Sequence, residues 1–195
     1  PVNSPLKRLQ KYTLMVVATV AMLGCQSAYY SAMEKVGVHK RDIMLDRVEN
    51  AQTAQQDAQQ QFKSALDQLS QLINYDGGDL AAQYELVNDQ YEASKASAEE
   101  VGARISAIES VADALFDEWN DEIQQYSSAS LKQQSQQKMR KTQRNYQSLI
   151  KSMHRAKDRM APVLSALKDN SLYLKHNLNA QAIGALQGEY KTIKR

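Results

Sequence analysis

The sequence predicts an all-α fold: an elongated, antiparallel three-helix coiled-coil bundle with a short N-terminal helix and a C-terminal helical tail. Only 3 prolines and 7 glycines occur among the 195 residues, and no proline lies between Pro5 and Pro162. A β-sandwich or barrel needs a turn about every eight to twelve residues, and such turns are rich in these two residue types. Apolar residues recur instead at alternating spacings of four and three, which is typical of helices that wind around one another. Because aromatic residues make up only 7% of the chain, we expect a thin core.

Residues 1–24 have the order of a secretory signal, which is positive charge, a short apolar stretch and a small residue at the cleavage point. Lys7, Arg8 and Lys11 precede an uncharged, mostly apolar run over residues 13–23, and Gly24 follows. Eleven helical residues reach about 16 Å, whereas a bilayer core is about 30 Å thick. We therefore interpret residues 1–24 as a signal peptide rather than a membrane span.

Cys25 is the only cysteine of the chain and directly follows Gly24. This arrangement resembles a bacterial lipoprotein signal, in which the cysteine is lipidated; the alternative is a free cysteine in an ordinary helix. In lipoproteins an Asp after the cysteine favours the inner membrane, so Gln26 implies the periplasmic face of the outer membrane. Residues 25–39 would then form the lipid anchor and a short helix ending at Gly37, and residues 40–195 the helical coiled-coil domain.

The first long helix is predicted from residue 44 onward by its apolar repeat. Its core positions are Met44, Val48, Ala51, Gln55, Ala58, Phe62, Ala65, Leu69 and Leu72. Gly77 and Gly78 break the pattern, and Asp79 is suited to cap the next helix, because glycine favours helix C-termini and aspartate favours N-caps.

The second long helix is predicted over residues 79–125, about 70 Å at 1.5 Å per residue. Its core positions are Leu80, Tyr84, Val87, Tyr91, Ser94, Ala98, Val101, Ile105, Ile108, Ala112, Leu115 and Trp119. A serine-rich break follows, and Ser130 with Gln133 reads as a capping box. Short breaks between long helices favour antiparallel neighbours.

The third helix and the tail complete the bundle. Core positions of the third helix are Met139, Thr142, Tyr146, Leu149, Met153, Ala156, Met160, Val163 and Leu167. Pro162 lies in phase with this run, so we expect a kink there rather than an end. A final short helix capped by Asn179 would carry the apolar residues Ile183, Leu186, Tyr190 and Ile193.

Acidic and basic residues are concentrated in different predicted helices. Residues 76–122 hold 13 acidic and 2 basic side chains, whereas residues 132–160 hold 9 basic and 1 acidic. We expect these two helices to pair with each other, since opposite charges select which helices associate. The open alternative is that the basic stretch 132–160 binds anionic lipid or lipopolysaccharide. Nucleic acid is disfavoured as a partner, because no base-reading motif is present and the signal directs the chain away from DNA.

The chain offers no pattern that indicates catalysis, a metal or a cofactor. His39, His154 and His176 lie far apart in sequence, without metal-ligand spacing. Acidic pairs on a solvated helix lack the pocket that a general acid needs. We therefore predict no catalytic residues, no cofactor and no small-molecule substrate.

Two polar clusters and an aromatic group are the candidate interaction residues. His39, Lys40 and Arg41 would lie near Trp119, beside the second turn, while Lys175 and His176 would lie at the opposite end of the bundle. We favour a structural role for both clusters, in which Lys175 pairs with the acidic turn at Asp76 and Asp79. The alternative for the first cluster, which lies nearer the lipid anchor, is contact with phospholipid head groups. Phe116, Trp119 and Tyr126 are expected to pack the end of the bundle rather than form an interaction patch.

Several stretches resemble a family of Gram-negative lipoproteins defined only as a domain of unknown function, the DUF2959 type. They are residues 29–30, 34–42, 46–48, 116–119, 174–180 and 186–189, with Ala51, Gln55 and Phe62. The resemblance covers roughly residues 28–190 and implies a helical lipoprotein without an assigned activity.

Together these observations predict a non-enzymatic, lipid-anchored periplasmic rod at the outer membrane. It would act as a structural spacer or scaffold and have a protein partner in the envelope. The alternatives are an anionic lipid-binding module and, less favoured, an enzyme or enzyme subunit.

Overall fold

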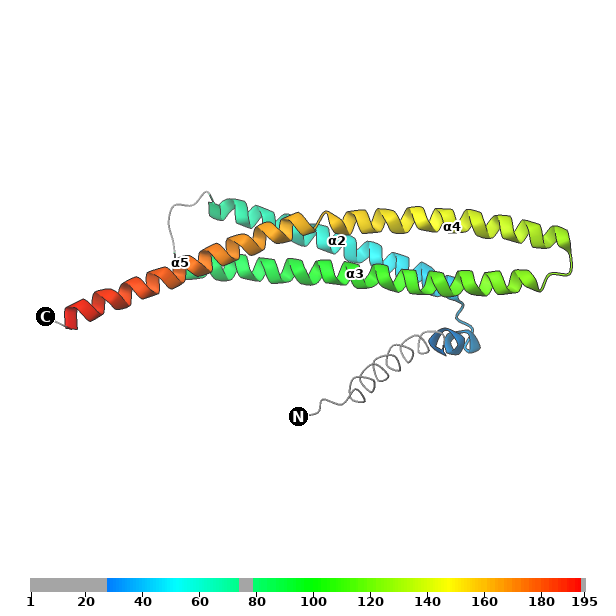
Figure 1. The fold of residues 1–195 in the computed structure, drawn as a ribbon, viewed down its shortest axis with the longest axis horizontal. Coiled ribbons are helices and arrows are strands. Elements are labelled where there is room, and N and C mark those ends of the chain that lie inside the picture. Colours follow the sequence, from blue (N-terminus) through cyan, green and yellow to red (C-terminus); the bar gives the residue numbers. More distant parts are fainter. Residues whose placement is uncertain (1–27, 74–78, 194–195) are drawn as a thin grey trace, which may run out of the picture. The chain divides into compact units, whose positions relative to one another are not determined.

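The computed structural model describes residues 28–73 and 79–193, with side chains for residues 28–71 and 79–184. Within these ranges every regular element is a helix. A short helix over residues 28–35 precedes α2 (Lys40–Ile73), α3 (Leu80–Gln124), α4 (Ala129–Asp158) and α5 (Ala161–Ile193) (Figure 1). The predicted all-α class is confirmed. The predicted signal peptide and Cys25 lie outside the described residues.

The chain divides into two compact units, and α2, α3 and α4 contribute to both. The described part of the first unit comprises residues 28–47 and 107–145, and that of the second comprises residues 48–73, 79–106 and 146–193.

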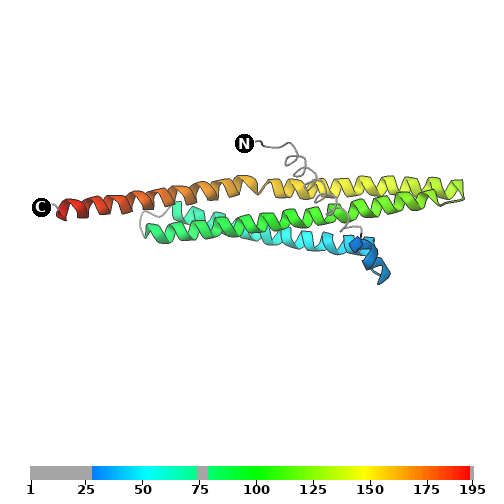
Figure 2. The ribbon, with the colours of Figure 1, turned by 60° about the horizontal axis from the view of Figure 1, so that its bottom comes forward.

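In the second unit, α2 and α3 are antiparallel, and the end of α4 with α5 covers them (Figure 2). Ala65 and Leu69 of α2 cluster with Val87 of α3 and Leu167 of α5. Polar contacts also join these helices. Gln61 Nε2 donates to Gln90 Oε1 at 2.9 Å, Gln55 Nε2 donates to the Met153 carbonyl at 3.3 Å, and Ser171 Oγ donates to Asn88 Oδ1 at 3.1 Å. The predicted core position Gln55 is therefore satisfied by a hydrogen bond.

In the first unit, the short helix packs against the start of α2 and the later part of α3. Tyr30, Ile43 and Val111 form the buried cluster, against which Met33 and Val38 also pack. The short helix ends at Gly37, as predicted. Gly37 has a φ of 85°, its N–H donates to the Glu34 carbonyl, and the Val38 N–H donates to the Met33 carbonyl. This pair of bonds is a Schellman motif, which requires a left-handed residue such as glycine.

The heptad positions predicted for α2 and α3 are inward-facing wherever side chains are described. Ala58, Ala65, Val101, Ile105 and Ile108 are all fully buried. In α4 the agreement is weaker: Thr142 is exposed and its neighbour Gln143 is half-buried. Within the described side chains of α4 only Met153 is buried, so this helix has a mostly solvated surface.

The predicted start of α3 is confirmed and that of α4 is corrected. Asp79 Oδ1 accepts the N–H of Ala81 at 2.9 Å, as expected of an N-cap. The prediction of a capping box formed by Ser130 and Gln133 is wrong. Ser128 is the cap, because its hydroxyl accepts the N–H of Leu131 at 3.4 Å, two residues earlier than predicted.

The third helix does not kink at Pro162 but ends before it. Residues 159–160 form a turn between α4 and α5, and Pro162 is the second residue of α5 (Figures 1 and 2). Proline is well tolerated in a first helical turn, where its missing N–H would have had no helical partner. The tail also differs from the prediction. It is part of the 33-residue helix α5 rather than a separate short helix capped by Asn179.

Candidate functional site

Four of the predicted interaction residues meet in one cleft of the first unit. His39, Lys40 and Arg41 at the start of α2 line it together with Trp119 of α3, as the antiparallel arrangement predicts. The cleft has a volume of about 470 Å³ and is further lined by Glu34, Leu115, Glu118 and Glu122. We call it the Lys40 cleft.

Lys40 is the centre of the cleft. It is 9% exposed, although lysine is almost never buried without a partner. Its ammonium donates to Glu34 Oε1 in a close contact and to Glu118 Oε1 at 3.1 Å. One lysine of α2 therefore joins the short helix to α3.

The ionisation of this triad follows from its geometry. Burial acts to lower the pKa of Lys40, but the hydrogen bonds to Glu34 and Glu118 outweigh it and raise the pKa above its usual value. The Lys40 hydrogen bond holds the pKa of Glu34 below its usual value. Lys40 and Glu34 are therefore charged at neutral pH, and together with Glu118 they form an ionic clamp.

A second network secures the same short helix. Tyr30 is 2% exposed, and its hydroxyl hydrogen-bonds Ser110 Oγ of α3 at 2.8 Å. Arg47 of α2 donates to the Tyr30 hydroxyl at 2.8 Å and to the Ala107 carbonyl of α3 at 2.6 Å. Its guanidinium also lies 5.5 Å from the Tyr30 ring centre, within the range of a cation–π contact. Tyr30 is thus held by packing, hydrogen bonds and charge together.

The remaining residues of the cleft have local roles. The His39 backbone N–H donates to Asp42 Oδ2 at 3.4 Å, which helps to satisfy the start of α2. Trp119 is half-buried, and its Nε1 donates to Ser135 Oγ of α4 at 2.9 Å. Phe116 is buried but Tyr126 is 44% exposed. Of the three aromatic residues expected to pack this end, Tyr126 therefore remains largely at the surface.

Lys175 and His176 are not part of the cleft. Both belong to the second unit and are exposed on α5. Among the described residues Lys175 makes no ion pair with Asp79, and Asp76 lies outside those residues. Leu174 takes the packed position, so the adjacent Lys175 is turned about 100° away from it on the helix.

None of the ion pairs found between described residues joins α3 to α4 within either unit. The ion pairs recorded there join residues of α3 to each other, neighbours on α2, or Lys40 to its two carboxylates. Seven of the nine basic residues of stretch 132–160 are exposed, namely Lys138, Arg140, Lys141, Arg144, Lys151, Arg155 and Arg159. Lys132 donates to Gln124 Oε1 rather than to a carboxylate. These long side chains face solvent because exposed ion pairs contribute little energy to hold them.

Neither a metal centre nor a membrane-spanning helix is found in the described part of the chain. No group of three or more His, Cys, Asp or Glu side chains there is placed to hold a metal ion. None of the helices in these ranges is both long and apolar enough to cross a bilayer.

The residues that sequence reasoning did not assign to the site are Tyr30, Glu34, Arg47 and Glu118. Each of them lies in a stretch that carries the DUF2959 resemblance. Those stretches are distant in sequence but meet around Lys40 and Tyr30. Residues of these stretches that follow no heptad position are therefore the signal that could have identified this contact network.

Comparison with known protein families gives a match. The family model described as "Protein of unknown function (DUF2959)" matches residues 29–195. Searches of curated proteins and of solved structures found no match. The matched range includes the short helix and all four long helices, and the chain therefore belongs to the DUF2959 family.

Proposed function

We propose that this protein is a non-enzymatic lipoprotein of the outer membrane, whose helical bundle acts in the periplasm as a structural spacer or scaffold. The observation that supports this most is the clamping of the short helix 28–35 to the bundle by Lys40 and Tyr30. A helix that only linked an anchor to a domain would need no such contacts.

The closeness of the clamp to Cys25 in the sequence explains how the clamp would contribute to a scaffold role. Only Gln26 and Ser27 separate Cys25 from the first helical residue. Three residue steps span at most about 11 Å, so an acyl anchor on Cys25 would lie close to the clamped helix. A force on the anchor, or a displacement of it, would then be transmitted to the bundle through the contacts of the Lys40 cleft.

Metabolic acyl labelling and membrane fractionation test the anchor. Wild-type protein is expected to be labelled and to fractionate with the outer membrane, whereas the Cys25→Ala variant should be unlabelled and released. Ser27→Ala serves as the matched control, because it alters the same segment without removing the thiol. An unlabelled wild type, or one found in the inner membrane, would contradict the proposal.

In-cell photo-crosslinking tests the scaffold role. A photoreactive residue would replace one of the exposed side chains Tyr126, Leu131 or Tyr173, which are 44%, 51% and 67% exposed. A discrete adduct with one envelope protein is expected from at least one position. The absence of any adduct across a scan of the exposed positions would contradict a scaffold that has a protein partner.

The solvated basic stretch 132–160 supports a second candidate function, the binding of anionic lipid or lipopolysaccharide. None of the ion pairs found between described residues joins one of its cations to α3. A basic residue close to an anionic bilayer contributes about 1 kcal/mol of binding free energy.

Vesicle binding by a soluble Cys25→Ser form separates this candidate from the first. Lys138, Arg140, Lys141 and Arg144 would be changed together to Gln, with expected loss of salt-dependent binding to phosphatidylglycerol vesicles. The control changes Lys63, Lys95, Lys168 and Lys175 to Gln, which alters net charge equally. Equal loss in both variants would indicate a general charge effect, and no binding by the parent would remove this candidate.

A further inference from the structure

We propose that the second unit binds one fatty acid in an open groove between α2 and the junction of α4 with α5. The groove has a volume of about 670 Å³ and its walls include Gln55, Gln59, Phe62, Leu66, Arg159 and Val163. This volume is within the range of about 300–1,000 Å³ that is usual for small-molecule sites. The proposal depends neither on acylation of Cys25 nor on the vesicle-binding candidate.

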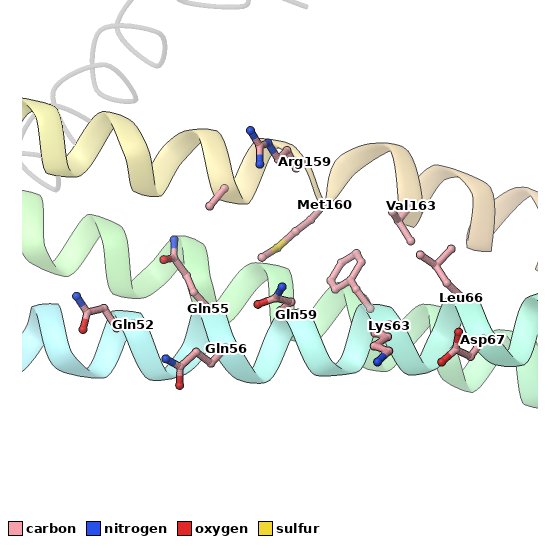
Figure 3. A pocket seen from close by; sticks show the side chains of 12 residues that line it. Gln52, Gln55, Gln56, Gln59, Lys63, Leu66, Asp67, Arg159, Met160 and Val163 are labelled. Carbon is pink, nitrogen blue, oxygen red and sulfur yellow. The ribbon is translucent and has the colours of Figure 1, made fainter.

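The groove is amphipathic along its length, which favours a ligand with one polar and one apolar end. Figure 3 shows Gln55 and Gln59 of α2 below Arg159, whereas Leu66 and Val163 face each other further along the groove. Phe62 is buried beside this apolar part. A hydrocarbon chain would cover the apolar walls, and its polar head would lie at the glutamine-lined end.

The charged residues that line the groove favour a ligand with an anionic head group. Lys63 and Asp67 are one turn apart on α2 and offset each other, which leaves Arg159 as the excess charge among the lining residues. Arg159 makes no ion pair among those found within the second unit. A guanidinium presents paired donors that match a carboxylate, and glutamine amides supply further donors. A ligand with one hydrocarbon chain and one negatively charged carboxylate is a fatty acid.

The helix break forms the groove at this place. Pro162 cannot continue the hydrogen bonding of α4, so the chain turns at Arg159 and Met160 before α5 begins. In Figure 3 the Met160 side chain extends from this turn toward α2. The Met160 methyl group is therefore a reporter inside the proposed site.

The test is a titration of the full Cys25→Ser chain with sodium decanoate below its micelle concentration, followed by methyl NMR of ¹³C-labelled methionine. We expect a saturable shift of the Met160 methyl signal. Arg159→Gln should weaken decanoate binding about tenfold, while Arg155→Gln, one turn away and outside the groove, should leave it within twofold. Uncharged 1-decanol should bind wild type and Arg159→Gln equally.

A filling variant tests the apolar end. Leu66 is 43% exposed, so Leu66→Trp should occupy the groove without disturbing the core and should abolish decanoate binding. Leu86→Trp, at a residue of the same unit that is 40% exposed, is the control. Thermal melting of each variant verifies that it is folded.

The proposal is overturned if the Met160 signal does not shift, if Leu66→Trp still binds, or if Arg155→Gln and Arg159→Gln lose affinity equally. Binding of lysophosphatidylglycerol without binding of decanoate would overturn the choice of a fatty acid in favour of a phospholipid source.

Discussion

Replacing Lys40 with Gln should destabilise the first unit by about 2 kcal/mol. The Lys40 side chain is 10% exposed, and those of Glu34 and Glu118 are 30% and 37% exposed. Breaking a fully buried ion pair costs about 3–5 kcal/mol, whereas an exposed pair contributes about 0–1 kcal/mol. We expect the free-energy contribution of the triad to lie between these limits, because a buried cation contacts two partly solvated carboxylates. Glutamine is one atom shorter than lysine and uncharged, so it leaves Glu34 and Glu118 as an uncompensated like-charge pair.

Thermal melting and native-state hydrogen exchange measure this effect. For a domain of this size, 2 kcal/mol corresponds to a fall in Tm of roughly 4–8 °C. Amides of residues 28–47 and 107–124 should exchange faster, because the clamp joins these segments. Arg41→Gln is the matched control. Its side chain is 69% exposed and pairs only with its neighbour Asp42 at 3.6 Å, so the expected change is below about 0.5 kcal/mol. A Lys40→Gln variant as stable as Arg41→Gln would refute the clamp.

Three further predictions concern pH and single side chains. The pKa of Glu34 is lowered in the folded protein, so its stabilising contribution is present above about pH 4.5 and is lost as the pH falls through the lower folded value. The stability difference between wild type and Glu34→Gln should therefore shrink on acidification, and a constant difference in pH-dependent melting would contradict this. Ser94 is fully buried with no hydrogen-bond partner for its hydroxyl among the described residues. Ser94→Ala should raise the free energy of unfolding by about 1 kcal/mol in urea titrations, and a loss of stability would reveal a missing partner. A Cβ at Gly102 would lie 3.3 Å from Cε and Nζ of Lys157, the mobile end of a side chain. Gly102→Ala should therefore keep most of the helix-propensity gain of about 1 kcal/mol and raise Tm by roughly 2–4 °C, whereas a lower Tm would show that Lys157 is fixed in place.

Much of the fold was predictable because it depends on local and periodic properties. The heptad positions of α2 and α3 were identified correctly, since burial repeats with the helical period wherever two neighbours pack. Gly37 and Asp79 were also predicted, because each satisfies backbone groups of its own helix end. The error at Ser130 has a similar local origin, since Ser127, Ser128 and Ser130 all have a side chain that favours an N-cap.

The α4–α5 junction and the charged helices were harder to predict. Pro162 is compatible with either a kink or a new first turn, and packing of Val163 and Leu167 in the second unit selects the latter. The opposite charges of α3 and α4 suggested ion pairs, but solvated ion pairs gain too little energy to impose a geometry. Gly102 fits no heptad position, and only the structure shows that the Lys157 side chain lies across it.

The sequence by itself determined the helical class, the inward-facing positions of α2 and α3, and the meeting of Lys40 with Trp119, because periodicity and short turns specify antiparallel neighbours. The tertiary structure decided which groups Lys40 contacts and where the groove between α2 and the junction of α4 with α5 lies. Those features depend on Glu118 and Met160, which are distant in sequence from their partners, and on Glu34, which the turn at Gly37 brings to Lys40. Their positions are set by packing and by the desolvation of a buried cation, which no local pattern encodes.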